Sequence, residues 1–240
     1  MSAESGVRCL VFDVFGTLVD WRGSIISAGH RIGDPKGVVV DWGALADDWR
    51  REGYLAPIRD LMDGTAPWQE VEAFLSPKLV ELLDRAGVQD LDSGEIAELC
   101  RVWEELDPWP DSVPGLERLC QTFVLSPLSN GSFAMLTRMA KRARLPWDCV
   151  ISSALFRSFK PDPAVYLGAA ELLGLPPREV MMVAAHAADL RAAAACGMRT
   201  AYVPRPLEWG PDAPPAEPVG DEFDVVAGDM IDLAGQLSPG

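Results

Sequence analysis

Residues 9–21 read CLVFDVFGTLVDW, an apolar run that leads into a lone aspartate, Asp13, and then into a turn at Gly16. An apolar run of this length, without alternating polar positions, is typical of a strand buried on both faces of a parallel sheet. An acid at the end of such a strand can be an ordinary turn residue. Its role therefore depends on what the rest of the chain places beside it.

The same apolar pattern recurs at residues 122–126, 149–153, 180–185, 200–203 and 223–227. Helical patterns separate most of these runs, at residues 131–143, 163–174 and 188–197. Alternating strands and helices predict an α/β fold, with a Rossmann-like parallel sheet as its core and helices on both faces. In such sheets ligands bind at the carboxyl ends of the strands, so the residues that follow each strand are the candidates for a site.

One long region breaks this alternation. Residues 21–110 contain helical patterns and no convincing strand, and the chain leaves the region through the proline-rich DPWPDSVPG at 107–115. We therefore predict a core made of residues 1–20 and 111–240, interrupted after its first strand by a helical insertion at 21–110. Residues 204–218 are rich in Pro and Gly, which predicts a loop before the last strand.

The composition narrows the choice of partners. The chain has 240 residues, 48% of them hydrophobic, and its 21 basic and 36 acidic residues give a formal charge of −15. This is enough apolar material for a packed interior. The charge repels nucleic acid and anionic membranes, so we expect neither as a partner. A small anion would have to be bound by a few locally placed cations or main-chain N–H groups.

Cysteine usage and hydropathy favour the cytoplasm. The five cysteines form no C-x-x-C pair and lie mostly in apolar stretches, which predicts buried and reduced thiols. No stretch approaches the ~18 apolar residues that a membrane span needs, and the opening residues MSAESGVRC lack the pattern of a signal peptide.

Three further strand ends carry polar residues. SPLSNGS at 126–132 places Ser129 and Asn130 ahead of a helix, where main-chain N–H groups can hold an anion, although simple helix capping also explains them. FKPDPAVY at 159–166 places Lys160 before a proline, where it either holds a carboxylate ionised or is simply solvated. Asp189 begins the next helix, as a cap or as an acid of the site.

Together, Asp13 in FDVFGTL, Ser129 and Asn130 in LSNGS, Lys160 in FKPDPAVY and Asp189 resemble the four ordered motifs of the haloacid dehalogenase superfamily. The resemblance covers residue 8 to about residue 205. It implies that Asp13 is a nucleophile that forms a covalent ester. It also implies that the insertion at 21–110 is the superfamily's helical cap domain.

Most members of that superfamily are magnesium phosphatases, and two positions separate this chain from them. The phosphatases carry a second aspartate two residues after the nucleophile and an acid four residues before the last aspartate, where this chain has Phe15 and Ala185. Mg²⁺ prefers several hard oxygen ligands, so both replacements argue against a metal site and against phosphoryl transfer. We expect no metal and no cofactor. A magnesium-dependent phosphatase and a non-catalytic member remain the alternative interpretations.

A halide leaves carbon without being protonated, so a site without a general acid suits the hydrolysis of haloacids. The chain resembles the type II L-2-haloacid dehalogenases, whose halide-binding arginine follows a tryptophan on the first long cap helix, and Arg50 after Trp49 matches that arginine. Arg51 is the rival candidate. An ion pair with Asp47 on the same helix would also explain Arg50.

The same resemblance assigns roles to the remaining residues. Its catalytic set is Asp13, Lys160, which keeps the acids ionised, and Asp189, which orients or activates the hydrolytic water. We predict a substrate and halide pocket that contains Arg50, Ser129, Asn130, Phe15, Val14, Tyr166 and His186, the last at a position where this chain departs from the family. In that pocket Asn130 would help to hold the halide, Ser129 and nearby N–H groups the substrate carboxylate, and Phe15 would face the apolar part of the substrate.

The fourth motif, VAAHAAD at 183–189, departs from the family pattern. His186 is either a hydrogen-bonded scaffold residue or a group that binds halide or acts near the ester. Ala188 replaces a bulky tryptophan of the family, which leaves substrate size and cleavage of C–F bonds open.

The predicted function is hydrolysis of short 2-haloalkanoic acids, of the haloacetate and L-2-halopropionate type, to 2-hydroxy acids. The expected partners are the haloacid, the halide ion and, by analogy, a second copy in a homodimer.

Overall fold

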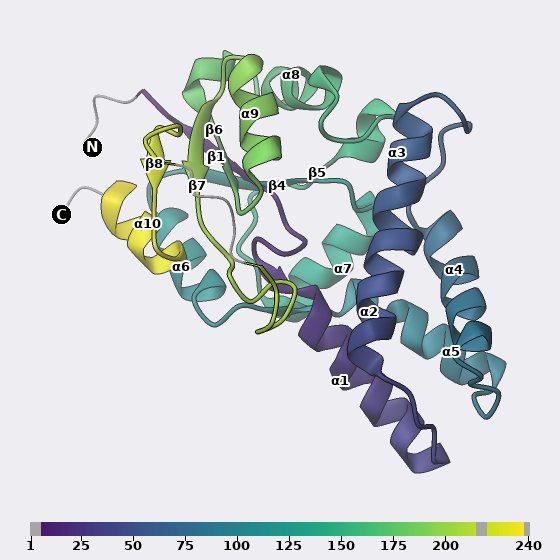
Figure 1. Cartoon of the computed structure of the whole chain (residues 1–240). Coiled ribbons are helices and arrows are strands. Elements are labelled where there is room, and N and C mark those ends of the chain that lie inside the picture. The colour runs from purple at the N-terminus through teal and green to yellow at the C-terminus, as the bar shows by residue number, and fades with distance from the viewer. Residues whose placement is uncertain (1–5, 215–219, 238–240) are drawn as a thin grey trace.

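The computed structural model describes residues 6–214 and 220–237, and Figure 1 shows the course of the chain. The main sheet has the strand order β5-β4-β1-β6-β7-β8, and every neighbouring pair runs parallel. Its strands are β1 (Cys9–Phe12), β4 (Val124–Ser129), β5 (Ile151–Ser152), β6 (Val180–Ala184), β7 (Arg199–Tyr202) and β8 (Val225–Val226). The predicted α/β fold with a parallel sheet is confirmed, and β1 lies between β4 and β6.

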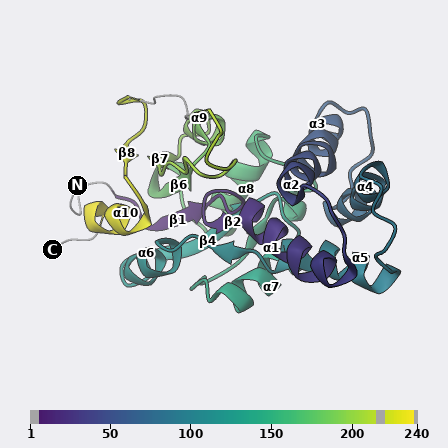
Figure 2. The ribbon, with the colours of Figure 1, turned by 60° about the horizontal axis from the view of Figure 1, so that its bottom comes forward.

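Side chains of β1 alternate between two apolar layers. Leu10 and Phe12 face the layer that contains α6 (Ser112–Leu119), α7 (Phe133–Ala143) and α10 (Met230–Leu237). Cys9 and Val11 face the opposite layer, with α8 (Pro163–Leu172) and α9 (Ala187–Ala195). Figure 2 shows these two groups of helices on opposite sides of the strands. Because helices cover both faces, β1 is apolar along its whole length, as its sequence indicates.

Several predicted details need correction. The strand predicted at 122–126 lies at Val124–Ser129, so Ser129 is the last residue of the strand and does not follow it. Helices α6 and α10 are not among the predicted helices; each is only eight residues long, and they pack against each other. The part of the predicted loop at 204–218 that the structure describes, 204–214, contains neither helix nor strand, and residues 215–218 lie outside the described residues.

The expectation of buried cysteines is only partly right. All five cysteines are free, but Cys9 alone among them is buried, whereas Cys120 is exposed and the others are half-buried. Cys120 is the residue that directly follows α6. Within the described ranges, no helix has both the length and the apolar character needed to cross a bilayer.

The helices of the insertion lie beyond one end of the sheet (Figure 1). They are α1 (Trp21–Gly33), α2 (Trp42–Arg50), α3 (Ala56–Met62), α4 (Glu72–Arg85) and α5 (Ser93–Cys100), with a π-helical stretch, η3 (Arg51–Leu55), and a 3₁₀ turn, η4 (Arg101–Glu104). Aspartate side chains cap three of them: Asp20 accepts from Gly23 N, Asp41 from Ala44 N, and Asp92 from the N–H groups that open α5. The prediction that residues 21–110 are mainly helical is confirmed.

The absence of strands from 21–110 is not confirmed. Asp107–Pro108 forms a short strand, β3, which pairs antiparallel with β2 (Val19–Asp20). A two-residue strand that contains a proline carries no sequence periodicity, so only the meeting of the two segments reveals it. The pair ties together the points at which the chain enters and leaves the insertion.

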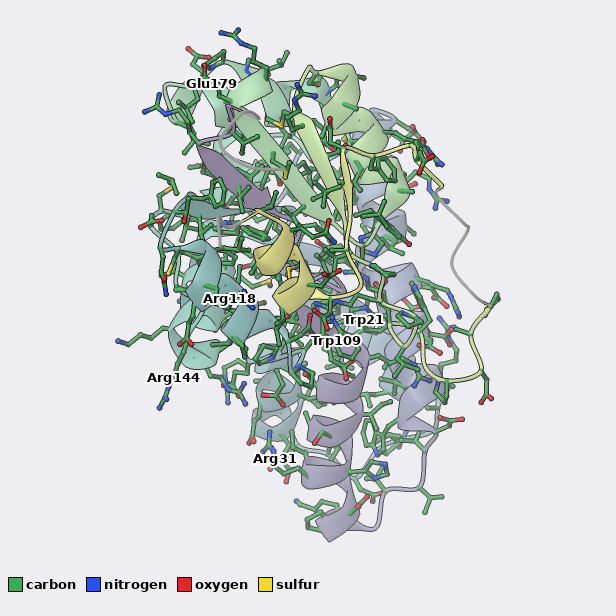
Figure 3. The ribbon with its side chains drawn as sticks, turned by 90° about the vertical axis from the view of Figure 1, so that its left-hand side faces the viewer. Trp21, Arg31, Trp109, Arg118, Arg144 and Glu179 are labelled. Atoms are coloured by element: carbon green, nitrogen blue, oxygen red, sulfur yellow. The ribbon has the colours of Figure 1, made fainter. Side chains whose placement is uncertain are left out.

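Hydrogen bonds from Trp109 and Ser112 strengthen this junction. The Trp109 indole donates to the Gly16 carbonyl at 2.9 Å, and Ser112 Oγ donates to the Leu18 carbonyl at 2.8 Å. In Figure 3 the labelled Trp21 and Trp109 lie between the sheet and the helices of the insertion. The turn after β1 is thus held directly by the segment that returns from the insertion.

Replacing Leu10 by alanine tests the position of β1 in the core. Leu10 is fully buried, so Leu10→Ala should lower the free energy of unfolding by about 2–5 kcal/mol through lost transfer energy and a cavity. Leu172, which is 60% exposed, is the matched control. Leu172→Ala should change the free energy of unfolding by less than about 0.5 kcal/mol. Urea unfolding followed by circular dichroism measures both. Equal effects of the two substitutions would contradict the central placement of β1.

Candidate active site

A cavity of about 310 Å³ lies where the residues that follow β1, β4 and β6 meet residues of the insertion. Eight of the ten predicted site residues line it: Asp13, Phe15, Arg50, Asn130, Lys160, Tyr166, His186 and Asp189. A larger cavity of about 550 Å³, lined from α4, α5 and α7, contains none of them. The chemistry-bearing residues therefore identify the smaller cavity as the candidate site, since size alone carries no chemistry.

The Asp13 carboxylate is buried and accepts three hydrogen bonds. Oδ1 accepts from Lys160 Nζ at 3.0 Å, and Oδ2 from Thr17 Oγ1 at 2.7 Å and His186 Nδ1 at 2.9 Å. Burial would raise the pKa of Asp13, but the charge of Lys160 and the hydrogen bonds from His186 and Thr17 hold this pKa far below its usual range. Asp13 is therefore a fully ionised carboxylate at the end of a central strand.

Lys160 bridges Asp13 to Asp189. Its ammonium also donates to Asp189 Oδ2, and the Tyr166 hydroxyl donates to Asp189 Oδ1 at 2.6 Å. Burial and the nearby negative charge of Asp13 raise the pKa of Asp189, against the opposing effects of Lys160 and Tyr166. The two carboxyls are thus driven in opposite directions, the arrangement expected of one nucleophile and one base.

The side chain of Asn130 is engaged in holding the Lys160 segment. Asn130 Oδ1 accepts from the Lys160 main-chain N–H at 2.7 Å, and Asn130 Nδ2 donates to the Lys160 carbonyl at 3.2 Å. These two hydrogen bonds to the main chain of one residue fix the point from which the lysine side chain extends toward Asp13. Asn130 lines the cavity as predicted, with a structural role that the sequence did not indicate.

Arg50 contributes a buried cation from the insertion. Its guanidinium lies 4.3 Å from the ring centroid of Tyr54, 5.5 Å from that of Trp21 and 5.7 Å from that of Phe15. Arg50 Nε and Nη1 are buried and have no hydrogen-bond partner among the described residues. A buried donor without a partner is costly, so an anion in the cavity would satisfy these groups.

The alternative explanation of Arg50 as the partner of Asp47 is wrong. Asp47 instead accepts from Arg22 Nε at 2.8 Å. The rival candidate, Arg51, does not line the cavity. Its side chain is 59% exposed, lies 3.9 Å from Asp48 and packs against the ring of Trp209, with its guanidinium 5.2 Å from the ring centroid. Of the two adjacent arginines, Arg50 is the one that lines the cavity.

His186 is part of the site through both ring nitrogens. Nδ1 lies 2.9 Å from Asp13 Oδ2, and Nε2 lies 2.9 Å from Glu208 Oε2. Burial alone would lower the pKa of His186, but the hydrogen bonds and charges of Asp13 and Glu208 raise it to about 10. The ring is therefore protonated at neutral pH, and both nitrogens donate.

Glu208 is the main site residue that the sequence analysis did not identify. It lies in the Pro- and Gly-rich loop after β7, and its Oε1 accepts from the Trp21 indole at 3.1 Å. Gly16 makes room for it: its φ is +87°, and a Cβ there would lie 2.1 Å from Glu208 Oε1. The only local signal is an acid placed between Leu207 and Trp209. Thr17 and the cavity-lining Tyr54 were likewise missed.

Val14 and Ser129 do not line the cavity. Val14 is 1% exposed, and its carbonyl accepts from Leu18 N and Val19 N within the turn. Ser129 is fully buried at the end of β4, and its Oγ accepts from Gly131 N at 3.4 Å. The assignment of these two residues to substrate binding stays a prediction.

In this chain, the residues at the two positions that carry acids in the phosphatases make other contacts. Phe15 packs edge-on against Tyr54 and Trp103, and the Ala185 main-chain N–H donates to Thr17 Oγ1 at 2.9 Å. The part of the chain that the structure describes holds no metal-type cluster of three or more His, Cys, Asp or Glu side chains. Because Phe15 and Ala185 supply no carboxylate oxygen at these positions, this donor set does not fit Mg²⁺.

Comparison with known proteins agrees with this geometry. The family model described as haloacid dehalogenase-like hydrolase matches residues 7–197. The chain belongs to this family. It is 34% identical over 208 residues to (S)-2-haloacid dehalogenase 4A of Burkholderia cepacia, covering 83% of this chain and 84% of that one.

Solved structures of the family are similar along almost the whole chain. The L-2-haloacid dehalogenase PA0810 is 40% identical with a TM-score of 0.90, covering 97% of this chain and 100% of that one. The defluorinating L-2-haloacid dehalogenase Rha0230 is 40% identical with a TM-score of 0.89, covering 99% and 98%. The strand order and the inserted helices are therefore a fold shared with these hydrolases.

Replacing Lys160 by methionine tests the ion network. Lys160→Met leaves two buried carboxylates without their shared cation, so it should lower the free energy of unfolding by about 3–5 kcal/mol at about pH 7.5. Without Lys160, burial and mutual repulsion raise the carboxyl pKa values above those of the unfolded chain. The folded variant then takes up protons as pH falls, so the deficit should shrink toward about pH 5.5. Urea unfolding at the two pH values measures this.

Lys141→Met is the matched control, because Lys141 is exposed on α7. It should leave stability nearly unchanged at both pH values. A deficit of Lys160→Met that stays constant with pH would show that lost packing, and not unpaired charge, causes the destabilisation.

Proposed function

We propose that this protein hydrolyses short 2-haloalkanoic acids, such as haloacetates and (S)-2-halopropionates, to 2-hydroxy acids through an ester on Asp13. One observation carries the proposal: an ionised, buried Asp13 shares a cavity with a buried arginine that has two unpartnered donors. Asp13 supplies a nucleophile, and the arginine, Arg50, supplies a site for an anion. The printed names of the similar proteins support the same reaction.

In the first step, an oxygen of Asp13 attacks the halogen-bearing carbon, and the carbon–halogen electron pair leaves with the halide. The halide needs no proton, which is consistent with the phenylalanine at position 15 in place of an acid. Arg50 Nε and Nη1 are suited to receive the halide as its negative charge develops. Asn130 Nδ2 carries a second N–H beside the one bound to Lys160, and we assign it to the halide as well.

In the second step, water attacks the carbonyl carbon of the ester. Asp189 is the base, since Lys160 and Tyr166 fix its carboxylate beside Asp13 and burial raises its pKa toward that of a useful proton acceptor. The bond between the Asp13 oxygen and the substrate carbon skeleton stays intact, so the product hydroxyl carries an oxygen from Asp13. An oxygen of the water remains in the aspartate.

The cavity supports small substrates. Its volume of about 310 Å³ is at the low end of ligand sites, and aromatic rings from Phe15, Tyr54 and Trp209 form much of its wall. Ala188 lines it without filling it. Because one similar structure is that of a defluorinating enzyme, fluoroacetate belongs among the test substrates beside chloroacetate.

We further propose that residues 1–20 and 111–240 form the catalytic core and that residues 21–110 act as a cap. The β2–β3 pair at the junction and the delivery of Arg50 by α2 support this division. A cytoplasmic location is part of the proposal, supported by five free cysteines.

A single turnover of chloroacetate in ¹⁸O-labelled water tests the ester mechanism. We expect the label in the peptide that contains Asp13, read by mass spectrometry, and chloride release that EDTA leaves unchanged. Asp13→Asn should lower chloride release at least ~10³-fold, because the nucleophile is lost. Asp63→Asn, at an exposed position, is the control. Magnesium-dependent phosphate release without halide release would overturn the proposal in favour of a phosphatase.

The substitution Arg50→Lys tests the proposed anion site. Arg50→Lys keeps the charge but loses the planar group that stacks on Tyr54, so kcat/KM for chloroacetate should fall about 10²-fold. Arg51→Lys changes an exposed side chain and should stay within about threefold of wild type. Chloride release under steady-state conditions measures both. A larger loss for Arg51→Lys would move the halide site to the rival arginine.

A further inference from the structure

Trp209 lies between the candidate active site and a second cavity. This outer cavity has a volume of about 490 Å³ and is lined by the stretch 210–214, by Arg51 and by the ion pair of Arg22 with Asp47. Trp209 lines both cavities, and no other described residue does so. Its indole therefore separates the two spaces.

A tight turn and two neighbouring side chains hold the Trp209 ring in place. The turn is closed by a hydrogen bond from the Gly210 main-chain N–H to the Leu207 carbonyl at 2.9 Å. The Trp21 ring meets the indole edge-on at 4.9 Å between centroids, and the Arg51 guanidinium lies 5.2 Å from the centroid of the indole. The ring is thus a fixed partition between the cavities.

The other aromatic walls of the active-site cavity have packed protein behind them. Phe15 and Tyr54 are 2% and 3% exposed, and their ring centroids lie 5.7 Å and 5.5 Å from that of the fully buried Trp103. Because protein interiors are packed nearly as densely as organic crystals, a substrate cannot extend past these two rings. Trp209, by contrast, is half-buried and has the outer cavity on its far side.

The outer cavity also shelters an uncharged chain better than the exposed side of the active site does. Leu55 and Pro161 line the active-site cavity and are exposed, so an alkyl chain that leaves beside them stays hydrated. In the outer cavity two prolines and an alanine of 210–214 supply apolar surface. Arg22 and Asp47 neutralise each other there at 2.8 Å.

We propose that Trp209 sets the upper limit of substrate chain length, and that the outer cavity receives the alkyl chain of a longer 2-haloalkanoic acid when this ring is made smaller. The inference rests on the proposed function and names the residue that restricts its substrate class. Trp209 takes no part in bond making or breaking. It determines specificity by occupying the space that additional methylene groups need.

Steady-state chloride release from (S)-2-chloropropionate and (S)-2-chlorohexanoate tests the inference. The hexanoate carries three more methylene groups, and each one that leaves water for a protein surface contributes about fourfold to binding. Trp209→Ala should therefore raise the ratio of kcat/KM for the hexanoate to kcat/KM for the propionate by about 30-fold. An unchanged ratio would overturn the inference, and so would an equal gain for both substrates.

Trp209→Phe keeps the test decisive if the alanine variant does not fold. Phenylalanine retains an aromatic ring between Trp21 and Arg51 but is smaller than the indole, so the same ratio should rise about threefold. Thermal unfolding followed by circular dichroism shows which variants are folded. If only Trp209→Phe folds, a ratio equal to that of wild type contradicts the proposed size limit.

Trp68→Ala is the matched control. Trp68 is also half-buried and also has an arginine over its ring, with the Arg157 guanidinium 5.0 Å from the ring centroid, but it lines neither cavity. The ratio for Trp68→Ala should stay within about twofold of wild type. A rise as large as that of Trp209→Ala would show that general loosening of the fold, and not the opened partition, admits the longer substrate.

Binding of halogen-free acids separates this inference from the proposed function, because it needs no turnover. In isothermal titration calorimetry, hexanoate should bind Trp209→Ala at least about tenfold more tightly than wild type, and the affinity for propionate should change by less than about threefold. If wild type releases no halide but hexanoate affinity rises in this way, the proposed function fails and the size limit stands. If wild type releases halide but hexanoate affinity does not rise, the inference about Trp209 is wrong.

Discussion

The ammonium of Lys160 lies between the carboxylates of Asp13 and Asp189, and all three side chains are nearly buried. Two carboxylates this close together, and away from water, do not both stay ionised without a cation. The fold meets this constraint through strand order. Asp13 follows β1 and Asp189 opens the helix after the adjacent β6, while Lys160 is held above them by its main-chain hydrogen bonds to Asn130.

A second constraint concerns positive charge in a chain whose formal net charge is −15. Long-range attraction therefore does not draw an anionic substrate to the protein, and the binding of anions depends on cations placed inside the cavity. We assign this role to Arg50, which comes from the insertion. Its guanidinium is surrounded by the faces of aromatic rings, which partly replace the lost hydration and leave two N–H groups for an incoming anion.

Small changes around Asp13 decide which chemistry a shared fold supports. Phe15 occupies the position of a phosphatase acid and packs into the aromatic wall, and Thr17 links the nucleophile to the main chain at Ala185. His186 and Glu208 add a second charged pair on the other side of the carboxylate. The fold supplies the positions, and these side chains supply the reaction.

The sequence by itself determined the alternation of strands and helices, the insertion and most strand-end residues of the site. These depend on local periodicity and on motif order, both of which can be read along the chain. Only the tertiary structure decided that Arg50, not Arg51, enters the cavity, that Glu208 lies behind His186, and that β3 exists. Each of these depends on which distant segments meet, because a one-residue shift on a helix turns a side chain by about 100° and a loop residue carries no periodicity at all.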